Sequence, residues 1–143
     1  MEEVCEHYPK RSCGRGWEQL DENRCMRIFW AKRNIVGAQK YCGMFGGTLV
    51  SLHNSAQMQR VTCLVWRRKF SDSKIWIGTA LSDRERQYHN IDGTAVDYTN
   101  WYPGLRYSRS KACVESNYKV WGRWHNTDCS EVKHFVCTKA LRP

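Results

Sequence analysis

Cationic and aromatic side chains are concentrated in residues 106–125, and together they could bind an anion. An arginine guanidinium matches sulfate, phosphate or carboxylate with two parallel hydrogen bonds, and lysine brings a point charge to the same groups. Aromatic faces beside these cations can stack on sugar rings or on bases. The stretch predicts a site for anionic or sulfated polysaccharide, with an unspecialised basic surface as the alternative. The candidate ligand-binding residues are Arg106, Tyr107, Arg109, Lys111, Lys119, Arg123 and His125.

The charge of the chain is positive and unevenly distributed. The net charge is +9, yet residues 1–22 hold six acids against three bases, so the remaining chain is more basic still. A field of this sign recruits polyanions and speeds their encounter, and charge alone leaves nucleic-acid binding open. A second basic run, Arg67-Arg68-Lys69, follows a predicted helix, where cations suit the helix dipole. A structural role and a binding role are both open for that run.

Eight cysteines in 143 residues indicate a disulfide framework and an oxidising compartment. No pair has the C-x-x-C spacing of structural zinc sites, so we expect no metal and no cofactor. No apolar run approaches the roughly 20 residues that a membrane span needs. No signal-peptide pattern is present either. We therefore expect a secreted, extracellular protein in its mature form, with no membrane span.

Two helices and several short strands are predicted, which places the chain in the α+β class. The first helix begins at Asn34, which can cap it, and ends at Gly46-Gly47. The second begins near Asn54, with Gln57 as a capping-box partner. From about residue 79 to residue 111 turn signals dominate and predict a long loop region. Strands are expected in residues 24–30, 48–52 and 75–78, with two or three more in 112–138.

The order of these elements resembles the C-type-lectin-like family over residues 13–138. We therefore interpret residues 13–143 as one C-type-lectin-like domain and residues 1–12 as a loose N-terminal extension. The resemblance implies two helices flanking small antiparallel sheets, with a long loop region. It is carried by Cys13, Gly16-Trp17, Cys25, Ala38, Cys42, residues 46–53, Trp76-Ile77-Gly78, Asp92-Gly93, Asn100-Trp101, Cys113-Val114, Cys129 and Phe135-Val136-Cys137.

The same resemblance implies most of the disulfide pairing. Three bonds follow from the family pattern: Cys13–Cys25, Cys42–Cys137 and Cys113–Cys129. Cys5 and Cys63 are left over, and we predict a fourth bond between them within the chain. Pairing of these two cysteines between chains is the alternative, so the chain could be a monomer or a dimer. The resemblance also implies that Trp121 and Trp124 are core residues.

Calcium-binding lectins of the family use carboxylate and Asn oxygens that also hydrogen-bond sugar hydroxyls. The family's ligand positions fall here on Leu105-Arg106-Tyr107, on Lys111 and on Trp124-His125-Asn126. Only Asn126 could serve, and Lys111 would place an ammonium where a dication should lie. We therefore expect calcium-independent binding. A separate calcium site within residues 79–97 stays open, because Asp83, Glu85, Asp92 and Asp97 lie there.

Three functions remain from this interpretation, and none of them is enzymatic. The first is recognition of an anionic polysaccharide or a glycoprotein by the basic loop. The second is protein–protein recognition, as in a receptor ectodomain or a secreted ligand. The third is ice binding of the type II antifreeze kind, which the cations in residues 106–111 disfavour. Enzymatic activity is not expected, because no nucleophile motif is present and the histidines are scattered.

Overall fold

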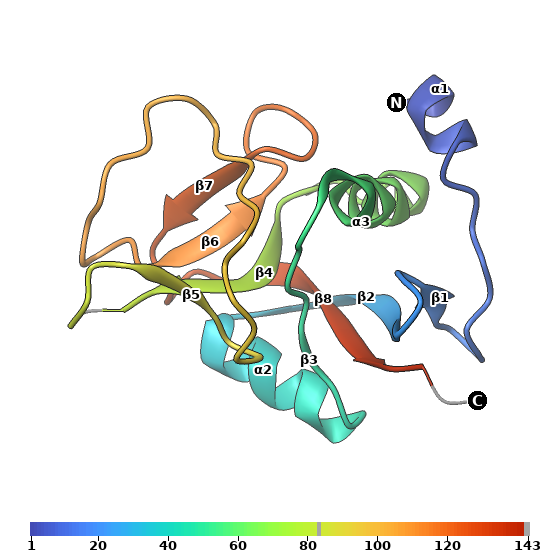
Figure 1. Cartoon of the computed structure of the whole chain (residues 1–143), viewed down its shortest axis with the longest axis horizontal. Helices are drawn as coiled ribbons and strands as arrows, with labels where there is room; N and C mark the ends of the chain where they lie inside the picture. The colour runs from blue at the N-terminus through green and yellow to red at the C-terminus, as the bar shows by residue number, and fades with distance from the viewer. Residues whose placement is uncertain (83, 142–143) are drawn as a thin grey trace.

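The computed structural model describes residues 1–82 and 84–141, and it has the predicted α+β architecture (Figure 1). Asp83 and the last two residues lie outside the described part. No helix in the described ranges is long and apolar enough to cross a membrane. The elements are α1 (Glu2–Glu6), β1 (Glu18–Gln19), β2 (Arg24–Arg33), α2 (Ile35–Met44), β3 (Thr48–Leu49), α3 (Ser55–Arg68), β4 (Ile75–Leu81), β5 (Tyr88–Asn90), β6 (Cys113–Ser116), β7 (Trp124–Thr127) and β8 (Lys133–Ala140).

The strands form one mixed sheet rather than separate small antiparallel sheets. Its order is β1-β2-β8-β4-β6-β7, with β3 beside β8 and β5 beside β4. The pair β4 and β8 is parallel, with Trp76 opposite Phe135, and the other pairs are antiparallel. Six of the seven residues of β4 are buried, so its backbone polar groups need partners on both edges, and it pairs with neighbouring strands on both sides.

The two main helices begin at the predicted caps. The Asn34 side chain accepts a hydrogen bond from the Gly37 N–H at 2.9 Å, and α2 follows. The Asn54 side chain accepts from the Gln57 N–H at 2.8 Å, while the Gln57 side chain accepts from the His53 N–H at 2.7 Å. Gln57 therefore accepts from the residue before the cap and not from the Asn54 N–H, so this differs from the predicted capping box, although both bonds act where α3 starts. Lys69 ends α3 in the left-handed conformation.

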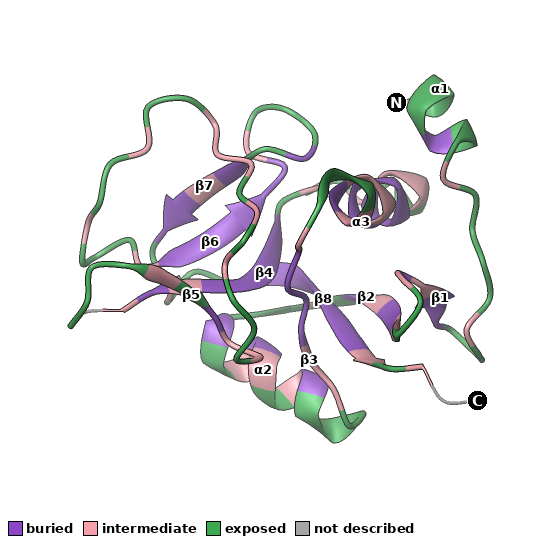
Figure 2. Ribbon diagram, viewed as in Figure 1, coloured by how far each residue is buried: buried purple, intermediate pink, exposed green. Residues whose placement is uncertain are grey.

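Helices α2 and α3 cover opposite faces of the sheet, and each face has its own core (Figure 2). On the α3 side, Met58, Val61 and Val65 pack on the sheet as the helical spacing predicts. On the α2 side, the aromatic ring of Phe29 stacks on that of Phe135, with centroids 5.5 Å apart. Both layers exclude water from the sheet, so the loops at its ends rest on a rigid base.

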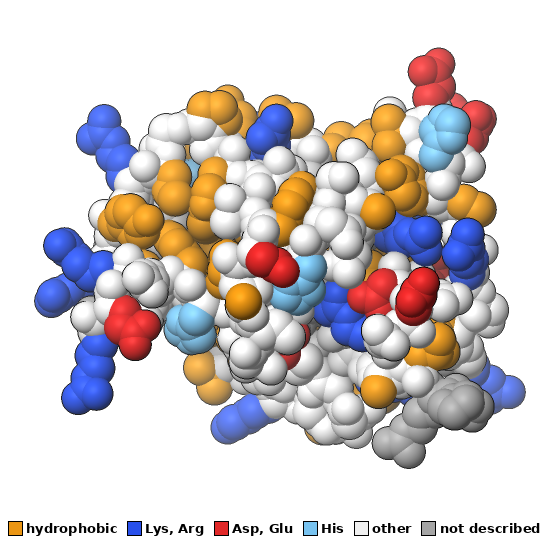
Figure 3. Space-filling model, viewed as in Figure 1, with side chains coloured by type: hydrophobic (Ala, Val, Ile, Leu, Met, Phe, Trp, Pro, Cys, Tyr) orange, Lys and Arg blue, Asp and Glu red, His pale blue; other side chains and the backbone are white. Residues whose placement is uncertain are grey.

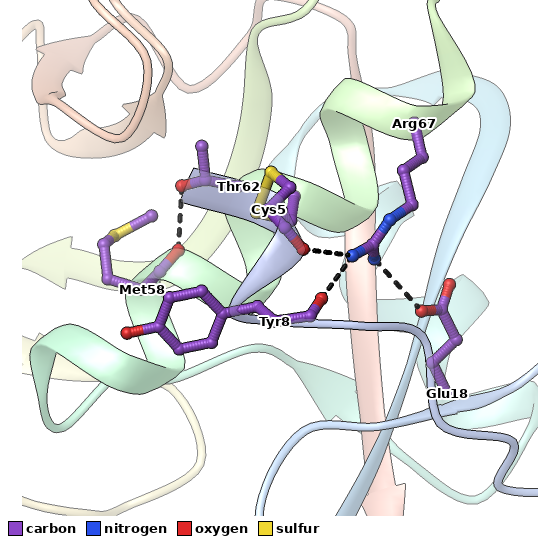
Figure 4. Close-up of a disulfide and its surroundings, with 7 residues drawn as sticks. Cys5, Tyr8, Glu18, Met58, Thr62 and Arg67 are labelled. Carbon is purple, nitrogen blue, oxygen red and sulfur yellow. Dashed lines mark hydrogen bonds and ion pairs between the residues drawn. A yellow bond between two sulfur atoms is a disulfide. The ribbon is translucent and has the colours of Figure 1, made fainter. Parts of the chain in front are cut away.

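All four predicted disulfides are present, and Cys5 pairs with Cys63 within the chain. The N-terminal extension is more ordered than the sequence indicated. Residues Glu2–Glu6 form α1 beside the end of α3, where the Arg67 guanidinium donates to the carbonyls of Cys5 and Tyr8 (Figure 4). The same guanidinium lies 3.8 Å from the Glu18 carboxylate. These carbonyl bonds hold a segment whose composition alone suggested a loose chain.

The long loop region is fixed to the sheet at several points. Strand β4 continues to Leu81 and pairs with β5, so regular structure extends into the predicted loop. A bridge between Trp101 and Trp124 and a hydrogen bond from the Tyr102 N–H to the Trp124 carbonyl hold its later part. The loop is therefore a positioned surface at one end of the molecule (Figure 1).

Candidate functional site

A stacked aromatic pair on the β6–β7 hairpin is the centre of the candidate site. The hairpin pairs Glu115 with His125, and the next residues form a tight loop back to β7. The Tyr118 and His125 rings lie 3.8 Å apart at 10°, and the Tyr102 ring meets Tyr118 edge-on. The Lys119 ammonium lies 5.4 Å from the Tyr118 ring centroid and 5.7 Å from that of Tyr102. We call Tyr102, Tyr118 and His125 the aromatic platform.

Three lysines lie near enough to His125 to affect its charge. Burial lowers the pKa of His125 below its ordinary 6.5, and the charges of Lys111, Lys119 and Lys74 lower it further, while Glu115 opposes them. The imidazole is therefore neutral at pH 7, and the lysines supply the positive charge. Lys74 was missed from the sequence. It reaches the platform because Ile75 pairs with Ser116, which places its neighbour Lys74 beside the hairpin loop.

Tyr107 and Arg109 have neighbours other than the aromatic platform. Tyr107 is 62% exposed, and its ring lies 5.8 Å from that of Tyr88. Arg109 and Tyr107 line a shallow hollow together with Arg86, which the sequence analysis did not single out. Cationic side chains project from this end of the molecule (Figure 3). We call Arg86, Tyr107 and Arg109 the loop-tip cluster. No residue of the aromatic platform lines the hollow that these three residues share.

Arg106 and Arg123 have contacts of their own. The Arg106 carbonyl accepts a hydrogen bond from the Asn126 amide at 2.7 Å. The Arg123 guanidinium donates to the Asn100 side chain at 3.1 Å and to the Trp101 carbonyl at 3.4 Å. The structure therefore brings Lys111 and Lys119 near His125. Arg123 is also next to the platform, because its carbonyl accepts from the Tyr118 N–H at 3.0 Å, but its guanidinium is used by Asn100 and Trp101.

The side chains that could hold calcium are engaged with other groups. The buried Glu115 carboxylate forms an ion pair with the Lys133 ammonium at 2.8 Å, and Lys133 also reaches Glu131 at 2.8 Å. Asn126 directs its amide nitrogen, not its oxygen, at a carbonyl. In the described part of the chain, no three His, Cys, Asp or Glu side chains are grouped to share a metal ion. These residues do not fit a calcium cage of six to eight oxygens.

Asp92 and Asp97, two of the acids within residues 79–97, hold the loop through contacts with neighbouring side chains. Asp92 accepts hydrogen bonds from the Ser51 and Thr94 hydroxyls, and these bonds lower its pKa against the opposing effect of burial. Asp97 lies 2.7 Å from the Nδ1 atom of His53, and this contact lowers the Asp97 pKa. Glu85 is exposed, and Asp83 lies outside the described residues.

His53 is not isolated, although the sequence suggested so. Its Nε2 atom lies 3.1 Å from the Ser51 hydroxyl, which gives a Ser–His–Asp series with Asp97. The Ser51 hydroxyl is no nucleophile, however, because Ser51 is fully buried and its hydroxyl donates a hydrogen bond to the Asp92 carboxylate. The cluster is a structural clamp between the loop and the start of α3.

The two hairpin tryptophans differ in environment. Trp124 is buried in the core, as expected, at 1% exposure. Trp121 was also expected in the core, and that expectation is wrong, because 38% of Trp121 is exposed. The tight turn between β6 and β7 directs Trp121 outward, next to the exposed Val120.

The known proteins that resemble this chain identify its family. The pattern of the lectin C-type domain matches residues 31–139, which is most of the chain. The C-type isolectin Sp-CL4 of Scorpaena plumieri is 34% identical over 137 residues, covering 94% of both chains. The chain belongs to the C-type lectin domain family.

Other members extend the comparison. The galactose-specific lectin nattectin of Thalassophryne nattereri is 27% identical, with 91% of this chain and 82% of that protein covered. The crystal structure of human lithostathine superposes with a TM-score of 0.82 at 26% identity, over 90% of this chain and 91% of that one. A calcium-independent type II antifreeze protein has a TM-score of 0.79 at 24% identity, covering 92% and 96%, and shows the fold alone.

This C-type lectin domain is a binding protein and not an enzyme, as the sequence predicted. Its family membership also confirms the α+β lectin fold that the spaced motifs indicated. The site therefore has to act by holding a ligand, and its geometry limits which ligands fit.

Proposed function

We propose that this C-type lectin domain is a secreted protein that binds anionic or sulfated polysaccharide without calcium. The observation that carries the proposal is the aromatic platform with Lys74, Lys111 and Lys119 around it. Aromatic faces suit the apolar faces of sugar rings, and the lysines suit sulfate or carboxylate groups. A carbohydrate ligand agrees with the lectin relatives.

Independence from calcium is supported by the charges at the family's ligand positions. Lys111 belongs to the cation cluster near His125, so a bound dication would meet repulsion there. The Glu115 carboxylate already has the Lys133 ammonium as its partner at 2.8 Å. The net charge of +9 adds long-range attraction for a polyanion.

A glycan array with sulfated and neutral glycans, read with calcium and with EGTA, tests the proposal. We expect binding to sulfated glycans that EGTA leaves unchanged and that weakens steeply as salt increases. Micromolar calcium binding in isothermal titration, or glycan binding that EGTA abolishes, would contradict calcium independence.

Two triple variants of equal charge locate the site. Changing Lys74, Lys111 and Lys119 to Ser should weaken heparin binding about a hundredfold, since each lost ionic hydrogen bond costs roughly 1 kcal/mol. Changing Arg86, Arg106 and Arg109 to Ser removes the same charge from the loop tip, and we expect less than about a threefold loss, since those cations act only at long range. Equal losses in both variants would mean an unspecialised basic surface.

A further inference from the structure

Trp121 and Val120 form an exposed apolar ridge at the turn of the β6–β7 hairpin. Val120 is 51% exposed and Trp121 is 38% exposed. Lys119 precedes them and Arg123 follows them, with Gly122 between. Exposed apolar side chains rimmed by polar residues can line a ligand-binding groove.

The turn that presents this ridge is fixed by hydrogen bonds on both sides. The buried Asn117 side chain donates to the Ser73 carbonyl at 2.8 Å and accepts from the Gly122 N–H at 2.8 Å. The Asn100 side chain donates to the Gly122 carbonyl at 2.7 Å. Asn117 and Lys119 also have positive φ angles of 71° and 58°, which side-chain-bearing residues rarely adopt. The turn is thus held in a costly conformation that points the ridge outward.

A groove lies on each side of the ridge, and Trp121 lines both. The first groove has a volume of about 600 Å³ and runs between the hairpin turn and residues 71–74. The second has a volume of about 360 Å³ and runs between the ridge and α3. Both volumes lie in the range of small-ligand sites. The indole therefore separates two concave surfaces that a single extended ligand could occupy.

The two grooves differ in charge. Lys74, Lys119 and Tyr118 line the first, and its carboxylate, Asp72, is paired with Lys32 at 3.3 Å. The first groove thus presents ammonium groups to an acidic sugar.

Hydroxyl and amide groups line the second groove. Ser55, Gln59 and Tyr98 supply these groups. Arg123 also lines this groove, but its guanidinium donates to Asn100 and Trp101. The second groove thus suits the hydroxyls of an uncharged sugar.

We propose that Trp121 is the central contact for a polysaccharide of alternating acidic and neutral sugars, which lies across the ridge. An acidic residue binds beside Lys74 and Lys119, a neutral residue binds beside Gln59, and the indole packs against the sugar rings between them. This inference rests on the proposed function and specifies its ligand class. A bilayer is a poorer fit, because polar grooves flank the two apolar residues, whereas membrane-inserting surfaces are apolar over a wider area.

Two polyanions, one with sugar rings and one without, test the role of Trp121. The probes are tetrasaccharides in which uronic acids alternate with uncharged N-acetylhexosamines, and linear inorganic polyphosphate, with Kd measured by isothermal titration. Trp121→Ala should weaken tetrasaccharide binding about tenfold or more, as truncation of a central interface tryptophan does. Polyphosphate binding should change less than about twofold, because it needs only the lysines. Trp121→Phe keeps an aromatic face and should recover part of the affinity.

Trp30→Ala is the matched control, because Trp30 is 77% exposed and lines neither groove. It should leave both Kd values unchanged. Unchanged tetrasaccharide binding in Trp121→Ala overturns the inference, while the proposed function survives if the lysine triple variant still loses binding. Failure of the wild-type protein to bind either polyanion overturns both. Loss of binding to anionic vesicles in Trp121→Ala without any loss of tetrasaccharide binding overturns the inference in favour of a membrane contact.

Discussion

The cations at the end of α3 and those around the aromatic platform differ in what they contact. Arg67 reaches two backbone carbonyls and the Glu18 carboxylate, so its charge holds α1 on α3. Lys119 instead lies over the rings of Tyr102 and Tyr118, in a cluster with other lysines. A cation with oxygen partners inside the protein stabilises the fold. A cation that faces rings and other cations is available to an external anion.

Lys133 gives the sharpest test of the claim that a cation with oxygen partners inside the protein stabilises the fold. It is buried beneath the platform, where the Glu115 and Glu131 carboxylates raise its pKa against the effect of burial. Lys133→Met should lower the free energy of unfolding by about 3–5 kcal/mol, because Glu115 is left buried without its partner. Lys119→Met should change it by less than about 1 kcal/mol. Urea denaturation of the oxidised proteins measures both.

The double variant Lys133→Met with Glu115→Leu separates the lost ion pair from the lost contact with Trp76. Replacing both charges should restore most of the stability, since a buried pair is often no better than apolar side chains of similar volume. If the double variant is as unstable as Lys133→Met, the lost contact between the Lys133 ammonium and the Trp76 ring, 5.2 Å apart, accounts for the effect.

The next largest difference in unfolding free energy is expected between Arg67→Ala and Arg68→Ala. Arg67→Ala should cost about 1.5–3 kcal/mol of unfolding free energy, since its hydrogen bonds to carbonyls involve a charged donor. Arg68 is exposed, and Arg68→Ala should stay within about 0.5 kcal/mol of the wild type. Proteolysis of residues 1–12 should accelerate only in Arg67→Ala. Equal protection in both variants would show that the Cys5–Cys63 bond alone holds the extension.

Local sequence signals predicted most of the fold. Asn34 and Asn54 mark helix starts because a cap acts on the next turn of the same segment. The spaced cysteines predicted the disulfides through the family resemblance. The outward direction of Trp121 had no such signal. It depends on Asn100 and Ser73, which lie far from the hairpin in the sequence.

The candidate site was only partly predictable for the same reason. Residue type identified Lys111, Lys119 and His125, which the structure brings together. Lys74 joins them through the register of β4 on β6, which no local pattern specifies. Arg123 has the right type but donates to Asn100 and Trp101. Composition identifies which side chains could bind an anion, and tertiary contacts determine which of them are available.

The smallest predicted effect is on the pH dependence of stability and binding, and it arises from His125 in the aromatic platform. Its pKa in the folded protein is below 6.5, first because of burial and then because of Lys111, Lys119 and Lys74. The unfolded chain therefore binds this proton more readily than the folded chain. The free energy of unfolding should fall as pH falls below about 6.5, through the folded-state pKa. Above that pH the residue is neutral in both states and contributes nothing to this dependence.

An anion bound at the platform should reverse part of this effect. It offsets the lysine charges and raises the pKa of His125, so binding takes up a proton. Tetrasaccharide affinity should therefore increase about three- to tenfold between pH 7.5 and pH 5, since one pKa unit corresponds to a factor of ten. Acidification would then weaken the fold and strengthen binding through one residue.

Tetrasaccharide affinities of His125→Gln and of the control His89→Gln, measured from pH 7.5 to pH 5, test whether His125 causes the pH dependence of binding. His89 is exposed on β5, so His89→Gln should keep the full pH dependence. His125→Gln should have nearly flat affinity from pH 7.5 to pH 5, because the group that takes up the proton is gone. If His125→Gln keeps the wild-type dependence, the pH dependence of binding does not arise from His125, although its imidazole lies 3.7 Å from the buried Glu115 carboxylate.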